Sequence, residues 1–494
     1  MKINFKFVII FFSFLGINFW SFGQSDTIRL TLFETIEMAK KESYDAMIAE
    51  NNYMASYWAY RNYKSSFFPT LDLHARPATF NRNISKQFSF IDTSYYYLEE
   101  RNLNSYLNLT LNQNLPFSGG KIYIDSDLGR LSNFGDRESQ QFSATAFRIG
   151  LQQQLFGYNA FKWEKRLQPL RFQMDKIGFS QNQEEISLKA AEYFFSCVKS
   201  YQSYAIAKTN HDNANNLYNM GEKRFDLTSI TKSELLSLKL EVVNTRNSMS
   251  QARNLYERSS KRLLSFLGLD EEKEFVAIVP EEIPDLEIDG DNLLEKARKH
   301  NPDYLSFRYQ ELEAERQVEQ AKINSRFSAN LSASYGVNQW SETFNEVYAD
   351  MLDQQRFDVT INVPLVDWGV RKNKYNLSKR QQDAKLFSLR QQESELEQNI
   401  MMTVAEFNLQ REMVESAKEA ADIAVEVYDL TTQRFILGEA TVNDLIIRSN
   451  SKDNALNNYY NEINTYWRLF YSIRRISMFD FIQNKPLETN IEGL

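Results

Sequence analysis

The side chains that could do chemistry are few and scattered along the 494-residue chain. Its three histidines, His74, His211 and His300, lie far apart, and none has the spacing of a zinc site. Cys197 is the only cysteine, so neither a disulfide nor a cysteine metal site can form. Its helical surroundings, 190–204, favour a packing role. We therefore expect no metal and no cofactor.

Two serine-x-x-lysine spacings could place an amine near a hydroxyl: Ser229 with Lys232, and Ser449 with Lys452. Acylating enzymes with this pattern carry companion motifs that the sequence lacks. A phosphate-binding glycine loop and a nucleophile elbow are absent from the sequence as well. We interpret both pairs as coincidence and predict that the protein is not an enzyme.

The N-terminal residues have the pattern of a cleaved secretory signal. Lys2 and Lys6 precede a short apolar run, 7–20, and Ser21-Phe22-Gly23 places small residues at both positions that a signal peptidase inspects. A retained membrane anchor is the weaker interpretation, because no basic cluster follows the run. We predict a signal peptide over residues 1–24.

The charge balance restricts the partners. The formal charge is −8, and loss of Lys2 and Lys6 with the signal takes it from −8 to −10, which argues against nucleic acid as a partner. After the signal, no apolar stretch is long enough to span a bilayer as a helix, so membrane insertion would need strands. This leaves a soluble periplasmic protein or a barrel.

Alternating polarity predicts strands in both halves of the chain. Every second residue is apolar over 327–338 and 357–365, and more briefly over 71–75, 107–112 and 147–151. Turn signals at 116–120 and 133–136 could bound an extra hairpin. Strands of about 10 residues with this alternation are typical of a transmembrane barrel. One chain thus offers four to six strands, which is too few to close a barrel alone, so a barrel would require several chains.

Apolar spacings of three and four predict coiled-coil helices between the strands. Two stretches, 157–227 and 369–437, could each form a helix roughly 100 Å long at about 1.5 Å per residue. Shorter helices are expected over 32–66, 230–267, 292–325 and 441–479. An acidic segment with two prolines, 270–291, resembles a linker.

The two halves repeat in outline. One set of residues in the first half recurs 210 positions later: Tyr218, Arg224, Phe225 and Leu235 correspond to Tyr428, Arg434, Phe435 and Leu445. A second set recurs 258 positions later: Glu37, Ala39, Lys41 and Asp45 correspond to Glu295, Ala297, Lys299 and Asp303. We infer an internal duplication, with a first repeat over 25–290 and a second over 291–494.

Aromatic residues gather near the expected strand ends, and Tyr95, Tyr96 and Tyr97 form a triplet. An interfacial girdle of a barrel is one explanation. Packing within a large extracellular loop region, 81–104, is the other.

Several segments, in this order and spacing, resemble the TolC-like outer-membrane efflux family. They are Phe68-Pro69-Thr70-Leu71 entering a strand, Pro364-Leu365-Val366-Asp367-Trp368-Gly369 leaving one, and Arg434-Phe435-Ile436-Leu437-Gly438 at a helix end. The resemblance covers nearly all of the mature chain. It implies an α+β membrane protein, a homotrimer that shares a transmembrane β-barrel continuous with a long α-helical coiled-coil tunnel in the periplasm.

The family's location and partners follow from the same resemblance. It implies a protein in the outer membrane, in contact with outer-membrane lipid. There it would be the exit duct of a tripartite efflux or type I secretion system, working with a periplasmic adaptor protein and an inner-membrane pump. The alternative is a non-transport periplasmic coiled-coil structural protein.

The resemblance also implies a periplasmic gate. Asp444 matches an aspartate that lines the family's constriction, and Glu234 holds the corresponding place in the first repeat. A ring of such carboxylates would attract cations and raise the pKa of each member, whereas ordinary solvated helix residues would do neither. The family's locking tyrosine and second aspartate align with Phe435 and Ile447, so we expect closure by apolar packing of these two residues.

Two helix turns would form the rim that meets the adaptor. They are Leu227-Thr228-Ser229 in the first repeat and Leu437-Gly438-Glu439 in the second. Gly438 could also serve simply as a helix cap.

Overall fold

The structure is a computed structural model that describes residues 28–135, 138–227, 230–273, 275–278 and 283–487. The predicted signal peptide lies outside these residues. The described chain divides into two units. The first contains 28–44, 189–284 and 413–465, and the second contains 45–188, 285–412 and 466–487.

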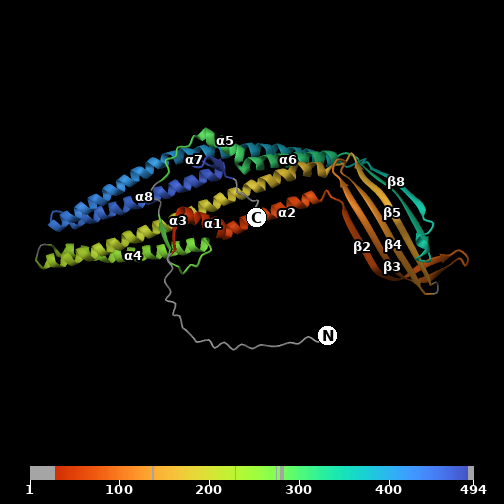
Figure 1. Cartoon of the computed structure of the whole chain (residues 1–494), viewed down its shortest axis with the longest axis horizontal. Coiled ribbons are helices and arrows are strands. Elements are labelled where there is room, and N and C mark those ends of the chain that lie inside the picture. The colour runs from red at the N-terminus through yellow and green to blue at the C-terminus, as the bar shows by residue number, and fades with distance from the viewer. Residues whose placement is uncertain (1–27, 136–137, 228–229, 274, 279–282, 488–494) are drawn as a thin grey trace, which may run out of the picture. The chain divides into compact units, whose positions relative to one another are not determined.

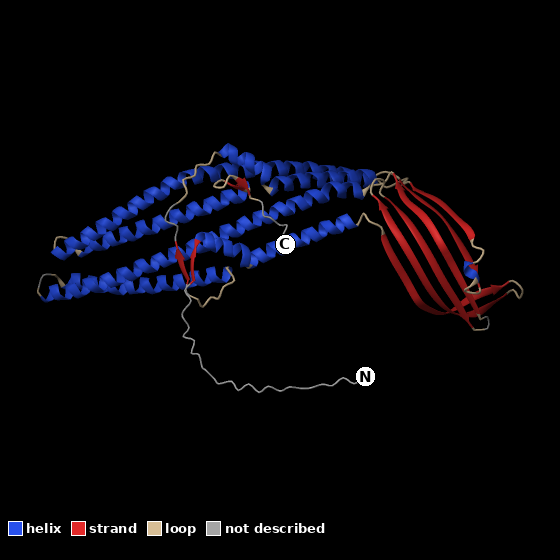
Figure 2. Ribbon diagram, viewed as in Figure 1, coloured by secondary structure: helices blue, strands red, loops and turns tan. Residues whose placement is uncertain are grey.

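The second unit contains a six-stranded antiparallel sheet in the order β2-β3-β4-β5-β7-β8 (Figures 1 and 2). Its strands are β2 Thr70–Ser89, β3 Ser94–Leu115, β4 Gly120–Phe134, β5 Ser139–Leu155, β7 Ser328–Ser341 and β8 Leu352–Asn362. The extra hairpin that the turn signals allowed is therefore present as β4 and β5. A short 3-10 helix, η1 Glu346–Tyr348, precedes β8. β2 and β8 are the two edges of the sheet.

The strand register separates the side chains into an apolar and a polar face, as the alternation predicts. One row on the apolar face crosses five strands: Leu71, Leu111, Ile124, Ile149 and Tyr335. The adjacent row on the polar face contains Asp72, Thr110, Asp125 and Arg148. The apolar row is solvent-exposed in a single chain, so this face requires another covering.

Two long helices run through the chain, as the sequence predicts. α3 Ala160–Asp226 has 67 residues and α7 Val370–Leu437 has 68. Each is followed by a shorter helix, α4 Lys232–Phe266 and α8 Val442–Ser477. No helix in the described part of the chain is both long and apolar enough to cross a membrane.

Two predicted helices were wrong in one respect, because each is broken. The stretch 32–66 forms α1 Leu32–Glu42 and α2 Tyr44–Ser65, with Ser43 extended at ψ 150°. The stretch 292–325 forms α5 Gly290–His300 and α6 Pro302–Asn324, with Asn301 extended at ψ 129°. Proline disfavours helical backbone in the residue before it, which explains the second break. The two breaks are 258 positions apart (301 minus 43), the same offset as the repeat.

Short strands tie down three remaining segments. In the first unit, β1 Ile28–Thr31 pairs in parallel with β6 Phe275–Ile278. In the second unit, β9 Phe479–Asp480 pairs with β10 Lys485–Pro486.

In the second unit, α3 packs against both α2 and α6. Ala49 and Tyr53 of α2 form an apolar cluster with Phe179 of α3. Nearer the sheet along α3, Trp163 and Leu167 pack against Leu312 of α6. These buried aromatic and aliphatic side chains fix the helices that lead into the sheet.

Candidate functional site

The turn after α7 exposes the residues predicted to meet an adaptor. Gly438 has a φ of +85° and ends the helix in a Schellman motif: its N–H donates to Phe435 O at 3.0 Å, and the Glu439 N–H donates to Arg434 O at 2.9 Å. Apart from Gly438 and its two chain neighbours, no described heavy atom lies within 4 Å of the position that a Cβ would take, so the backbone conformation alone requires glycine here. Leu437 beside it is 73% exposed.

The corresponding turn after α3 is described only in part. Leu227 is 74% exposed, whereas Thr228 and Ser229 lie outside the described residues. Both turns thus present an exposed leucine at the end of a long helix. Whether they meet an adaptor stays a prediction.

The two carboxylates predicted to line the gate occupy equivalent positions, each in the first turn of a short helix. Asp444 of α8 accepts hydrogen bonds from Thr441 N at 3.0 Å and Thr441 Oγ1 at 2.7 Å. Glu234 of α4 accepts the same two bonds from Thr231, at 2.7 and 2.8 Å. Each threonine hydroxyl in turn accepts from the backbone N–H of the acidic residue, which completes a capping box.

These bonds lower the pKa of both carboxyl groups in a single chain. For Asp444 the hydrogen bond from the Thr441 hydroxyl has the largest effect, and for Glu234 the backbone N–H of Thr231 does. Both side chains are exposed, so they remain charged and accessible. The capping role was not foreseen, although threonine three residues before an acidic residue is its sequence signature.

Phe435 and Ile447, predicted together as apolar gate residues, have different environments. Phe435 is 6% exposed and packs with Tyr428 and Leu445 in an apolar cluster within the first unit. Ile447 is 49% exposed. In a single chain, only Ile447 therefore has a surface free to contact another molecule, and its role in closure stays a prediction.

Arg224 of α3 fixes the end of α7 in the same unit. Its Nη2 donates to Ile436 O at 2.8 Å and to Phe435 O at 3.4 Å. Its guanidinium carbon lies 5.4 Å from the centre of the Phe435 ring. A cation at the C-terminal carbonyls complements the helix dipole, so Arg224 holds the α7 turn against α3.

In the first unit, a buried polar cluster also joins α3, α7 and α8. Lys452 of α8 donates to Asn210 Oδ1 of α3 at 3.3 Å, and its Nζ lies 4.2 Å from the centre of the Tyr428 ring. Asn210 Nδ2 donates to Asp453. Burial raises the pKa of Asp453, against the opposing effect of the Lys452 charge. Lys452, which the sequence suggested only as a chance partner of Ser449, is thus a buried cross-helix contact.

In the second unit, an ion pair lies on the polar face of the sheet. Arg148 Nε donates to Asp125 Oδ1 at 3.0 Å, and Arg148 Nη2 lies 3.8 Å from Asp127 Oδ2. Asp125 is buried by its neighbours. Charged groups therefore cross-link β4 and β5 on the face opposite the apolar one.

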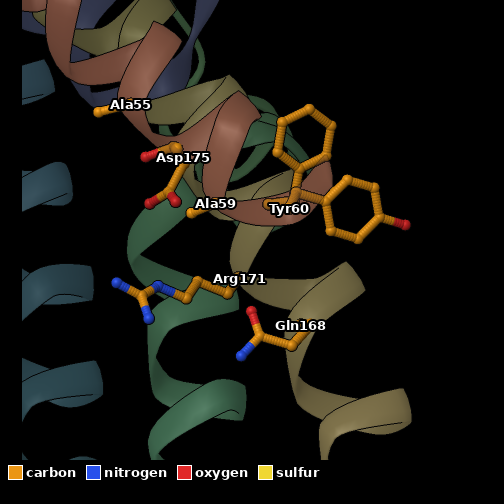
Figure 3. A pocket seen from close by; sticks show the side chains of 8 residues that line it. Ala55, Ala59, Tyr60, Gln168, Arg171 and Asp175 are labelled. Carbon is orange, nitrogen blue, oxygen red and sulfur yellow. The ribbon is translucent and has the colours of Figure 1, made fainter. Parts of the chain in front are cut away.

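A groove of about 240 Å³ lies between α2 and α3 in the second unit (Figure 3). The small side chains of Ala55 and Ala59 on α2 keep this groove open. Arg171 and Asp175 line it from α3, one helical turn apart. The lining contains neither histidine nor cysteine. The groove therefore does not place a nucleophilic side chain beside a general base.

The histidines are likewise dispersed. His74 lies in β2, His300 ends α5, and His211 of α3 lies with its Nδ1 3.3 Å from Thr245 Oγ1. Among the described residues, no three histidine, cysteine, aspartate or glutamate side chains are grouped so that they could hold a metal.

Several solved structures share this fold. The CmeC outer membrane channel of Campylobacter jejuni is 14% identical, with a TM-score of 0.65 over 94% of this chain and 88% of that one. The outer membrane protein VceC of Vibrio cholerae is 14% identical, with a TM-score of 0.63 over 90% and 95%. The MtrE outer membrane channel of Neisseria gonorrhoeae is 12% identical, with a TM-score of 0.58 over 90% and 88%.

Residues 293–459 match the family model described as Outer membrane efflux protein. No curated protein matches the chain. The fold and the family match define the class as an outer-membrane transport protein, not an enzyme. This family match and the shared fold confirm the resemblance found in the sequence.

Proposed function

We propose that three copies of this chain form a closed barrel and a helical tunnel, the exit duct of a tripartite efflux or type I secretion system. The observation that carries the proposal is the sheet, which has two open edges, β2 and β8, and an exposed apolar face. In a bilayer each unpaired backbone group costs several kcal/mol, so both edges must pair. Three sheets of six strands would close an 18-strand barrel, because three times six is 18.

The helices of the second unit support the same ring. Large hydrophobic side chains are exposed on α2, which leads into β2, and on α7, which follows β8. They include Met47, Ile48 and Trp58 on α2, and Leu377, Phe387 and Leu409 on α7. The described side chains of α6 and of α3 within this unit contribute no such exposed residue. Apolar patches confined to two edge elements fit a head-to-tail contact between neighbouring copies.

The gate in this proposal is formed by the first turns of α4 and α8. Three copies would bring three Glu234 and three Asp444 carboxylates toward one axis. Mutual repulsion would oppose the capping bonds that lower each pKa, and the ring would favour cations. The exposed Ile447, one turn further along α8, would add an apolar contact. The turns at Leu227-Thr228 and Leu437-Gly438 would meet the adaptor, which connects the duct to an inner-membrane pump.

Single-channel conductance in planar bilayers tests this gate. We expect Asp444→Asn with Glu234→Gln to reduce the cation preference of the closed-state current. The matched control is Glu34→Gln, because Glu34 forms the same capping box with Thr31 at the start of α1. An equal effect of the control variant would refute the gate. Ile447→Asp should raise the closed-state conductance, and an unchanged conductance would remove Ile447 from the gate.

A further inference from the structure

The apolar face of the sheet ends at a group of basic residues on β2, β3 and β4. The register aligns Phe80 with Leu103 and Arg82 with Arg101, so these four side chains share one face. Leu107, Leu109 and Leu111 lie on the same face of β3, at alternate positions. On β2 and β3, the first charged residues outward of the apolar stretch are therefore two arginines directly opposite each other.

The apolar stretch has the height of a membrane. Leu103 to Leu111 spans eight residues, about 27 Å along the strand at about 3.4 Å per residue. A strand tilt of about 40° reduces this to about 21 Å, near the roughly 25 Å apolar band of transmembrane barrels. The helices join the sheet at the other end, at Thr70 and Asn362. In the proposed duct the helical part is periplasmic, which places Arg82 and Arg101 at the outer boundary of the band.

The cations are concentrated on this face. Lys86 follows Arg82 along β2. Arg130 of β4 is aligned with Ser105 of β3, between Leu103 and Leu107, so it lies inward of Arg101 on the same face. On β2, β3 and β4 the one acidic residue of this face is Glu99, which accepts from Arg82 and from Arg101, the latter at 2.9 and 3.0 Å. Four cations and one carboxylate leave a formal charge of +3. At the same level, the polar face of β2 and β3 carries amides: Asn81, Asn83, Asn102 and Asn104.

Aromatic rings accompany these cations. Lys86 Nζ lies 4.1 Å from the centre of the Tyr95 ring, which in turn packs against Phe88 with ring centres 5.0 Å apart. Tyr95 to Tyr97 belong to β3, and most of 81–104 is strand, so the alternative explanation by a loop region was wrong. Rings beside cations at the end of an apolar band suit the interface between lipid chains and headgroups.

We propose that Arg82, Lys86, Arg101 and Arg130 bind the phosphate groups of an anionic lipid in the outer leaflet. The arginine fork matches phosphate oxygens in two-point hydrogen bonds, and the lipid's chains would cover the apolar face directly below. Glu99 holds Arg82 and Arg101 side by side, so both guanidinium groups face one headgroup. This inference rests on the proposed function, because it requires a closed barrel with its apolar face toward lipid.

Native mass spectrometry of the detergent-solubilised protein tests the site. The probes are bisphosphorylated lipid A, the same lipid after removal of its phosphates, and inorganic phosphate. We expect the phosphorylated lipid to bind at least about tenfold more tightly than the dephosphorylated one, since one charge-assisted hydrogen bond is worth on the order of tenfold. Arg82→Gln with Arg101→Gln and Arg130→Gln should abolish that preference.

Two controls make the result decisive. Arg76→Gln removes a cation from the polar face of β2 and should leave the preference intact, because Arg76 is aligned with Tyr106 on that face. Lysine at the three arginine positions should restore the preference in part, even if the glutamine variant folds poorly. Equal binding of both lipids by the unaltered protein, or of inorganic phosphate as tightly as lipid, would overturn the site. A conducting trimer without the lipid preference would refute this inference alone, whereas absence of the trimer would refute the proposed function.

Discussion

Replacing Arg474 tests how the C-terminal end of the chain is held in the second unit. Arg474 of α8 donates to Glu184 of α3 at 3.0 and 3.4 Å and to Asp480 in the segment that follows α8. The arginine side chain is 14% exposed, and the two acidic side chains are 4% and 6% exposed. Arg474→Met would therefore leave two buried carboxylates without their cation, a change that costs about 3–5 kcal/mol.

The neighbouring residue provides a matched control. Arg475 pairs with Glu185 at 3.3 Å, but these side chains are 35% and 40% exposed. A surface pair of this kind contributes about 0–1 kcal/mol, so Arg475→Met should have little effect. The two variants remove the same side chain from adjacent positions and differ mainly in the burial of the charges that remain.

Amide hydrogen exchange over residues 470–487 measures the difference. A loss of about 4 kcal/mol corresponds to exchange faster by on the order of a thousandfold, against less than about tenfold for Arg475→Met. Adding Glu184→Gln to Arg474→Met should recover part of the protection, because it removes one buried charge. Similar exchange in the two single variants would refute the assignment of the Arg474 cluster as the main fastening of this segment.

The remaining predictions concern the α7 turn, the edge helices and acid stability. Gly438→Ala should destabilise its turn by about 1 kcal/mol, because alanine is strained at a φ of +85°. The control Gly178→Ala, inside α3 with open space around it, should not destabilise the protein. Thermal unfolding compares the two variants. Phe387→Glu on α7 should reduce the trimer fraction in detergent at least about tenfold. Gln317→Glu on α6 introduces the same charge and should leave the trimer fraction unchanged. Equal trimer fractions of the two variants by light scattering would contradict the edge contact. Burial would raise the pKa of Asp480, but the backbone N–H groups of Gln483 and Ile482 and the Arg474 charge together lower it. The ionised Asp480 therefore stabilises the fold above the unfolded pKa of about 3.9, and this contribution is lost as the pH falls through the lower folded pKa. Exchange over 470–487 should rise only below about pH 4, and a rise near neutral pH would contradict this assignment.

Patterns that repeat along the chain predicted the fold well. Alternating polarity located the strands, and the helical spacing located α3 and α7 almost to their ends, because each pattern is set by the element's own geometry. The break at Asn301 had a visible signal in Pro302. Ser43 had none of comparable strength, since apolar spacing continues across it.

Contacts between distant segments could not be predicted. Lys452 and Asn210 are separated by 242 positions, and nothing in either sequence neighbourhood indicates that they meet. Phe435 and Ile447 are both apolar residues in helical patterns, yet one is buried within its own chain and the other is exposed. Burial of this kind depends on which helix faces pack together, which a single sequence does not specify.

The most direct test of the central claim is the mass of the mature chain, purified in detergent and in buffer alone, by light scattering. The duct predicts a particle of three chains that is soluble only with detergent and that conducts ions in a planar bilayer. A buffer-soluble monomer without conductance would contradict it.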